Sequence, residues 1–201
     1  MEAVWQLLQP VFAAGETYCM PRDVSRSEAL QYWTDSPHRT FLAVLGEAVV
    51  GTYFLTPNQR GGGAHVCNCG FVSSAACFGH GVATAMLRHA LAEAWRSGFR
   101  AMQFNFVVST NVRAVRLWER HGFQVVGRLP EAFNHPSEGF VDALVMFRTL
   151  SNDDERPYAS GEAEAATHVW EYLCKRDDLT EFEADPADAI LCLGSSDIRV
   201  A

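Results

Sequence analysis

The chain has 201 residues, of which 48% are hydrophobic and 20% are charged, so it can fill the core of a folded domain. Its formal net charge is −8, but residues 1–150 hold 12 arginines against 11 acidic residues, while residues 151–201 hold 4 basic and 13 acidic ones. This balance argues against the basic surface of a nucleic-acid-binding protein, and no apolar run reaches the roughly 20 residues that a membrane-spanning helix needs.

The start of the chain and the cysteines indicate a cytoplasmic protein. The first ten residues, MEAVWQLLQP, lack the basic segment that begins a secretory signal peptide. We therefore expect the six cysteines to be reduced. Only Cys67 and Cys69 are close together, and this spacing does not match a zinc site, so we expect no metal and assign both side chains to the core.

A change of composition near residue 150 divides the chain. Residues 1–150 form the candidate domain, and residues 151–165 (SNDDERPYASGEAEA) are acidic and without apolar period, which predicts a linker. Residues 166–201 contain a helical pattern over 166–173 and a strand pattern over 189–193. Because one helix and one strand cannot bury a core, this segment is expected to be an incomplete α/β unit or a poorly ordered tail.

The first half of the domain shows two helical patterns and then a hairpin. Their expected ranges are residues 4–14, 25–33, 40–45 and 48–55. Ser25 and Glu28 form a capping box at the start of the second helix. Gly46 and Glu47 make the turn of the hairpin, and residues 57–64 (PNQRGGGA) predict a loop.

The second half alternates strands and helices. Strands are expected over residues 65–72, 101–108, 123–126 and 140–147, and helices over residues 81–97 and 111–121. A hairpin followed by strand–helix–strand units predicts an α/β fold with a mixed sheet and helices on both faces.

The turn Phe78-Gly79-His80-Gly81-Val82-Ala83 opens the helix over residues 81–97. Glycine permits a tight turn and close approach of a ligand to the backbone. The first turn of a helix also has unpaired N–H groups at the positive end of its dipole. The segment therefore predicts a phosphate or pyrophosphate site. A tight turn that packs on the sheet is the alternative.

A second segment follows the next strand, about thirty residues after this turn: Asn111-x-x-Ala114-x-x-Leu117-Trp118-Glu119-x-x-Gly122-Phe123. The two segments, in this order, resemble the Gcn5-related N-acetyltransferases (GNAT) over roughly residues 3–150. The segments PNQRGGGAHVCNCGF, FNFVVSTN, VDALVM and GETY are similar to the subgroup of fungal acetyltransferases for proline analogues, such as azetidine-2-carboxylate, and their bacterial relatives.

The resemblance implies the fold and the reaction of that family. We expect an acyl-CoA N-acyltransferase fold that lacks the first edge strand, because the chain starts in a helix, so the edge of residues 40–45 is expected to be open. The implied reaction is transfer of acetyl from acetyl-CoA to the amine of a small molecule, an amino acid or an analogue, by direct attack. A homodimer is one expected oligomeric state.

The resemblance also implies a cofactor site. The turn that starts at Phe78 is expected to hold the pyrophosphate with backbone amides, those of Gly79, His80, Gly81, Val82 and Ala83. Backbone around Val72, Ser73 and Ser74 is expected to pair with the pantetheine arm like an added strand. One amide there, with Ser73 as the candidate, polarises the thioester carbonyl. Asn111 is expected to cap its helix and, with Ala114, to contact the cofactor.

The acceptor site is expected around Asn68, Asn105 and Tyr18. Asn68 shares a strand face with Val66, and Asn105 shares one with Gln103. Burying an unpaired amide costs about 1–3 kcal/mol, so each asparagine needs a partner. We expect both to line the cleft where their strands part, where they hold a substrate carboxylate and orient its amine. Core asparagines bonded to backbone groups are the alternative.

Two positions depart from the family pattern. Phe78 replaces an Arg or Gln, which removes a phosphate contact and predicts weaker cofactor binding. Trp118 replaces a Tyr that protonates the leaving thiolate, and since an indole N–H serves poorly in that role, Trp118 is expected to pack in the core.

The sequence does not identify the general base. His65, His121 and Asp142 are the candidates, although Asp142 is more consistent with ordering a loop. Two other functions stay open: a binding module that senses acyl-CoA without turnover, and transfer of acetyl to proteins or peptides. Near the C-terminus, residues 189–197 resemble the opening strand and turn of YdcF-like α/β domains.

Overall fold

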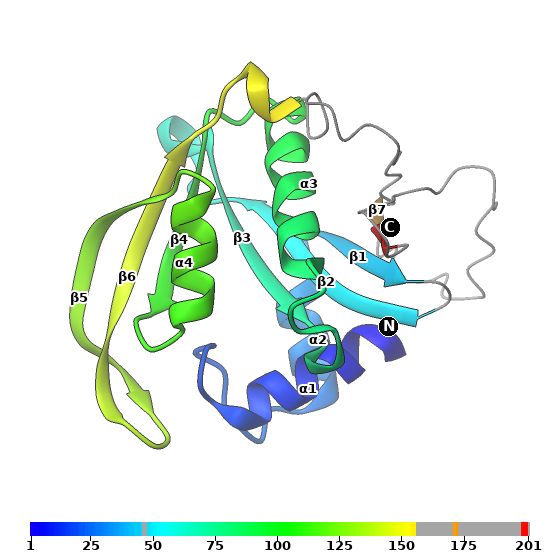
Figure 1. The fold of residues 1–201 in the computed structure, drawn as a ribbon, viewed down its shortest axis with the longest axis vertical. Coiled ribbons are helices and arrows are strands. Elements are labelled where there is room, and N and C mark those ends of the chain that lie inside the picture. The colour runs from blue at the N-terminus through cyan, green and yellow to red at the C-terminus, as the bar shows by residue number, and fades with distance from the viewer. Residues whose placement is uncertain (46–47, 156–170, 173–197, 201) are drawn as a thin grey trace.

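The structure, a computed structural model, describes residues 1–45, 48–155, 171–172 and 198–200. It has a twisted mixed sheet with helices on both faces (Figure 1), which confirms the predicted α/β class. The strand order is β5-β6-β4-β3-β2-β1-β7, and β8 also pairs with β1. No helix within the described ranges is long and apolar enough to span a membrane.

Within residues 1–149 the helices and strands follow the predicted order. Their bounds are α1 Glu2–Ala14, α2 Arg26–Thr34, β1 Arg39–Leu45, β2 Ala48–Pro57, β3 Val66–Ser73, α3 Val82–Arg96, β4 Ala101–Val108, α4 Val112–Arg120, β5 Gln124–His135, β6 Gly139–Thr149, β7 Glu171–Tyr172 and β8 Ile198–Val200. The capping box of α2 is present, with the Ser25 side chain accepting from the N–H of Glu28. The largest difference is β5, which was expected to end at residue 126 and continues to His135.

The extension of β5 has a physical reason. Register shifts interrupt its pairing with β6 between Val125 and Gly127 and again between Leu129 and Phe133. Most of the strand is exposed, so its side chains do not alternate between apolar and polar. The extension matters because it carries the β5–β6 turn to the cleft described below.

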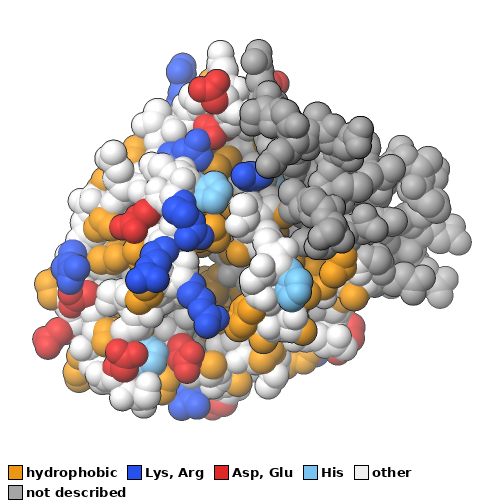
Figure 2. Space-filling model, in the orientation of Figure 1, with side chains coloured by type: hydrophobic (Ala, Val, Ile, Leu, Met, Phe, Trp, Pro, Cys, Tyr) orange, Lys and Arg blue, Asp and Glu red, His pale blue; other side chains and the backbone are white. Residues whose placement is uncertain are grey.

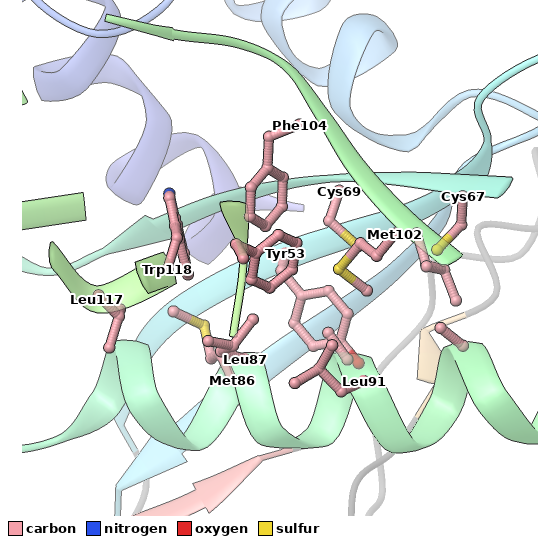
Figure 3. Packing of buried hydrophobic residues seen from close by; sticks show 14 of the residues in the cluster. Tyr53, Cys67, Cys69, Met86, Leu87, Leu91, Met102, Phe104, Leu117 and Trp118 are labelled. Atoms are coloured by element: carbon pink, nitrogen blue, oxygen red, sulfur yellow. The ribbon is translucent and has the colours of Figure 1, made fainter. Parts of the chain in front are cut away.

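One face of the sheet packs against α3 and α4. Tyr53 of β2, Cys69 of β3 and Met102 of β4 point toward the helix α3 (Figure 3), and all three are buried. The cluster also contains side chains of both helices, among them Met86, Leu87, Leu91, Leu117 and Trp118. This cluster is the larger of the two cores and holds the sheet to α3.

The opposite face packs against α1 and α2. Phe12 and Trp33 from these helices are buried against Phe54 of β2 and Val72 of β3. The indole N–H of Trp33 donates to the hydroxyl of Thr52, at 3.0 Å, so the buried polar groups here are paired. The α1 helix ends at Ala14, and the φ of 68° at the following Gly15 lets the chain turn back toward β3.

β3 and β4 are paired over a short distance only. Their parallel register joins Val66 to Ala101 and Cys67 to Met102, and then stops. Beyond this point β3 continues along β2 and β4 continues along β6. Figure 1 shows the two strands diverging, and we call the region beyond Cys67 and Met102, where β3 and β4 are no longer paired, the opening.

The edge of β1 was expected to be open, and the structure differs from this. β7 and β8 both pair antiparallel with β1, so the prediction of an open edge at β1 is wrong for these residues. Residues 171–172 form a strand where a helical pattern was expected. At the start of the predicted linker, the buried Asp154 accepts hydrogen bonds from Arg148 and from the N–H of Ser151. Residues 156–170, 173–197 and 201, which include the strand expected over residues 189–193, lie outside the described ranges.

Candidate functional site

The direction of the β3 backbone decides which of its groups face the opening between β3 and β4. The carbonyl of His65 accepts from the N–H of Arg100 next to β4, at 2.8 Å, whereas the N–H of Ser74 donates to the carbonyl of Val50 in β2, also at 2.8 Å. Backbone groups of alternate residues point to the same side of a strand. Ser73 therefore faces the opening, while the backbone groups of Val72 and Ser74 face β2, which leaves Ser73 as the available one of these three.

Tyr18 reaches the same edge of β3 from the loop after α1. Its hydroxyl donates to the carbonyl of Phe71 at 2.9 Å, and its ring packs edge-on against Phe12 and Trp33. Burial raises the pKa of this hydroxyl, so it stays protonated. The side chain thus ties the loop after α1 to the strand that borders the opening.

The turn before α3 has the geometry of an anion site. Gly79 and Gly81 have φ values of 80° and 81°, and a Cβ at either position would meet nothing within 4 Å. No side chain caps α3, and within the described ranges the amides of Gly79, Gly81, Val82 and Ala83 have no acceptor. The first turn of the helix is therefore open to a phosphate.

His80 differs from its neighbours in this turn. Its N–H donates to the carbonyl of Cys77 at 3.2 Å, so it is already occupied, contrary to the expectation for a pyrophosphate contact.

Asn111 caps α4 as predicted. Its Oδ1 accepts from the N–H of Ala114 at 3.3 Å, and Ala114 is half-buried against the α3 core. The cap orients the start of α4 beside the opening, because α4 follows β4 directly.

A cleft of about 420 Å³ lies beside the start of α4. Three segments line it: the loop after α1, the first turn of α4 and the β5–β6 turn. Its residues are Glu16, Thr17, Thr110, Asn111, Val112, Arg113, His135, Ser137 and Glu138. Figure 2 shows arginine side chains gathered over α4 above this region.

Sequence reasoning missed His135, Ser137 and Glu138. His135 is 7% exposed, and its Nδ1 is 3.2 Å from the Ser137 hydroxyl. The sequence feature that could have identified them is the turn His135-Pro136-Ser137-Glu138-Gly139. It points to the cleft only once β5 is known to extend to His135.

The two asparagines lie beyond the point where β3 and β4 part. Asn105 is exposed, donates to Oδ1 of Asn58 at 2.6 Å and accepts from Nε2 of Gln103 at 2.8 Å. Asn68 is half-buried and has no side-chain partner among the described residues. Neither is a buried core asparagine, so that alternative is wrong. Asn58, in the loop after β2, was not predicted.

None of the three candidate bases is among the residues that line the cleft. Asp142 accepts from the N–H of Glu131 at 3.0 Å and from Arg128 at 2.6 Å. These hydrogen bonds lower the pKa of the carboxyl, with the Glu131 amide as the larger cause. They hold a segment that was expected to be a loop and that belongs to β5. The ring of His121 lies 2.9 Å from the carbonyl of Leu117, and burial lowers its pKa. His65 is exposed at the start of β3.

The remaining predictions concern packing. Trp118 is 7% exposed with its ring 4.7 Å from that of Phe104, which confirms it as a core residue. Cys67 and Cys69 lie in the same core. Burial raises the pKa of Cys67 to about 12 and that of Cys69 well above the ordinary value, so both remain thiols. Among the described residues, no group of three His, Cys, Asp or Glu could hold a metal ion.

Comparisons with known proteins agree with this geometry. The chain is similar to N-acetyltransferase aca1 of Schizosaccharomyces pombe, at 34% identity over 99 residues, which are 49% of this chain and 47% of that protein. The chain thus spans about half the length of the curated relative that it matches. The structure is similar to that of a GCN5-related N-acetyltransferase from Kribbella flavida, with a TM-score of 0.71 and 40% identity over 74% of this chain and 91% of that one.

A third protein shares the fold at low identity. It is a phosphinothricin acetyltransferase from Sinorhizobium meliloti solved in complex with AcCoA, with a TM-score of 0.65 and 16% identity over 80% of this chain and 86% of that one. The sequence model of one family, described as the acetyltransferase (GNAT) family, matches residues 1–123. Since this match covers more than half of the chain and agrees with the divided sheet, the chain belongs to the GNAT family.

Proposed function

We propose that the protein transfers an acetyl group from acetyl-CoA to the amine of a small molecule, an amino acid or an analogue. The observation that carries this proposal is the opening between β3 and β4, bordered by the unpaired backbone of Ser73 and continued by the open turn before α3. The relative from Sinorhizobium meliloti was solved with AcCoA on the same fold, which supports the assignment of the donor.

The described residues fit acetyl-CoA along this opening. The free amides of Gly79, Gly81, Val82 and Ala83 are suited to the pyrophosphate, and Asn111 and Ala114 are placed at the start of α4 to contact the same molecule. The pantetheine arm fits beside β3, where its amides can pair with Ser73 in the manner of an added strand. The donor supplies a thioester, whose carbon is the site of attack.

The reaction is a direct transfer. The neutral amine forms a C–N bond to the thioester carbon, the C–S bond breaks, and coenzyme A leaves with the electron pair as a thiolate. The N–H of Ser73 faces the opening and stabilises the negative charge on the carbonyl oxygen during attack. Most of the remaining rate comes from holding both substrates together.

The amine must lose a proton before or during attack. Among the described residues that line the cleft, we propose His135, Glu16 and Glu138 as candidates for the group that receives it. None of the three was predicted as a base from the sequence.

The acceptor is proposed to bind beside the hydrogen-bonded pair Asn105 and Asn58, with Asn68 of β3 as a further contact. The hydrogen-bonded row Gln103–Asn105–Asn58 holds the Asn105 amide in one orientation, and the unpartnered Asn68 lies on the neighbouring strand. Amide N–H donors of this kind suit a substrate carboxylate. Tyr18 supports this side by fixing the loop after α1 to β3. A cytoplasmic location and a homodimer stay predictions.

The test is release of free thiol from acetyl-CoA with a panel of small amino acids and cyclic analogues, run beside a panel of short peptides. We expect turnover with at least one small amine. Turnover with peptides alone contradicts the small-molecule acceptor. Binding of acetyl-CoA without turnover on either panel contradicts catalysis and favours an acyl-CoA-binding module.

A further inference from the structure

Arg113 makes an unusual contact between α4 and the turn before α3. Its guanidinium carbon lies 5.2 Å from the centre of the Phe78 ring. Arg113 belongs to the first turn of α4, and Phe78 directly precedes Gly79 in the open turn. The phenyl ring is 58% exposed, so the contact is on the surface at the mouth of the anion site. An aromatic face attracts a cation and fixes where it lies.

The charge of Arg113 is not used within the described parts of the chain. Arg113 takes part in none of their ion pairs, although Glu16 and Glu138 line the same cleft. A guanidinium that stacks through its flat face keeps its in-plane N–H donors for other partners. The ring of Phe78 thus holds a cation with free donors beside four free backbone amides.

Arg113 also begins a row of positive charge. Arg116 and Arg120 follow at steps of three and four residues, which places all three on one side of α4. Figure 2 shows basic side chains gathered over α4. Arg113 is the member of the row that stacks on a residue of the turn before α3, namely Phe78.

We propose that Arg113 binds the pyrophosphate of coenzyme A and that Phe78 positions it. Phe78 has no side-chain donor for a phosphate. Arg113, which lies on α4 and contacts Phe78, supplies that donor instead. This inference rests on the proposed function, since it assigns a residue to the same site. Phosphate recognition by an arginine uses charge-assisted hydrogen bonds, which are stronger than those between neutral groups.

Coenzyme A offers two sources of phosphate, the pyrophosphate and the 3′-phosphate. The structure favours the pyrophosphate because Phe78 is bonded directly to Gly79, the first residue with a free amide in the turn. Dephospho-coenzyme A keeps the pyrophosphate and lacks the 3′-phosphate, so it separates the two sources.

The experiment is calorimetric titration of coenzyme A and dephospho-coenzyme A into the full chain and its variants. Arg113→Ala is expected to weaken both ligands about 10-fold, in line with the loss of one hydrogen bond to a charged group. Arg120→Ala, the matched control on the same helix, is expected to stay within about 2-fold, since its charge lies two turns away and is screened by solvent.

A second variant checks the role of position 78. Phe78→Arg in the Arg113→Ala background returns a cation to the turn itself and is expected to restore most of the affinity, to within about 3-fold of the wild type. Thermal unfolding of each variant shows whether the fold is retained. The wild-type affinity is also expected to fall more steeply with salt than that of Arg113→Ala.

Three results overturn the inference. Equal affinities of Arg113→Ala and the wild type for both ligands refute any phosphate contact. A loss confined to coenzyme A assigns Arg113 to the 3′-phosphate instead. Failure of Phe78→Arg to restore the affinity in the Arg113→Ala background refutes the claim that an arginine at position 78 can replace Arg113. The proposed function fails separately, if the folded wild-type protein binds neither ligand.

Discussion

β3 and β4 are neighbours whose two ends differ. At the closed end, Cys67 and Met102 are paired across the strands, and their side chains lie in the core against α3. At the open end, the strands part, and Ser73 and Asn105 face solvent or the opening instead of each other. One pair of strands therefore provides both the rigid core and the unpaired backbone on which the proposed chemistry depends.

The difference teaches that the site is built largely from main-chain groups left without a strand partner. Replacing a side chain at the open end leaves the backbone N–H in place, whereas proline removes it. Substitutions at the closed end act on stability instead, because they disturb packing. The following predictions separate these two kinds of effect, from the largest to the smallest.

The largest effect is expected for Ser73→Pro. It deletes an N–H that faces the opening without breaking the β2–β3 ladder, so kcat is expected to fall about 100- to 1,000-fold, as for loss of one oxyanion donor. The measurement is single-turnover thiol release at saturating acetyl-CoA.

Two matched variants control this experiment. Ser73→Ala keeps the backbone amide and is expected to retain kcat. Val72→Pro removes an N–H that faces β2 and is expected to lower the thermal midpoint of unfolding instead. An unchanged kcat in Ser73→Pro contradicts the assignment of this amide.

The buried histidine His89 predicts that the stability of the fold depends on pH. Nδ1 of His89 in α3 is hydrogen-bonded to the Tyr53 hydroxyl. Burial, with Arg96 and Arg39 nearby, lowers the pKa of His89 to about 3. In the unfolded chain His89 binds a proton near pH 6.5, whereas in the folded chain it binds one only near pH 3. The unfolding free energy therefore falls as the pH drops from 6.5 toward 3. The loss reaches up to about 2 kcal/mol at pH 5.

Urea unfolding of the wild type and His89→Gln at pH 7 and pH 5 measures this effect. Glutamine keeps an acceptor for Tyr53 and does not titrate. The same loss of stability in both proteins at pH 5 contradicts the role given to His89.

Gly81→Val tests the open turn. Valine is strained at a φ of 81°, so the turn is expected to shift and the affinity for acetyl-CoA to fall about 10-fold. Gly98→Val is the matched control, since Gly98 has a φ of 83° with open space around it at the other end of α3. Calorimetry is expected to show weakened binding for Gly81→Val only, and a similar loss in both variants contradicts the anion site.

Asn105→Ala tests the acceptor face. Loss of one hydrogen bond to the substrate is expected to raise KM for the amine about 5-fold, with the affinity for acetyl-CoA unchanged. Gln103→Ala keeps the Asn105–Asn58 contact and is expected to have the smaller effect. A KM for the amine that does not move in Asn105→Ala places the acceptor elsewhere.

Trp118→Phe is expected to have the smallest effect on catalysis. The indole is packed between Phe71 and Phe104, so the variant should lose about 1 kcal/mol of stability and keep turnover within about 2-fold. Steady-state kinetics and thermal unfolding check both parts, and a large fall in kcat with intact stability indicates a catalytic indole.

The elements of the fold could be predicted because their residues carry local signals. Ser25 and Glu28 mark a helix start, and the apolar residues of α3 recur at three- and four-residue steps. The cap at Asn111 is equally local. The extension of β5 to His135 has no such signal, since the strand is exposed and bulged.

The site could be predicted only in part, because it depends on register. Knowing that Val72, Ser73 and Ser74 form the end of β3 does not say which backbone faces the opening; the bond from Ser74 to Val50 decides it. The contact of Arg113 with Phe78 joins positions 35 residues apart, and no pattern in the sequence predicts it.

The most direct test of the central claim is a crystal structure of the full chain grown with coenzyme A. The account predicts the pyrophosphate on the amides of Gly79, Gly81, Val82 and Ala83 and the pantetheine arm in the opening, hydrogen-bonded to Ser73. Coenzyme A bound elsewhere on the molecule, with the opening between β3 and β4 filled by the protein's own side chains, would contradict it.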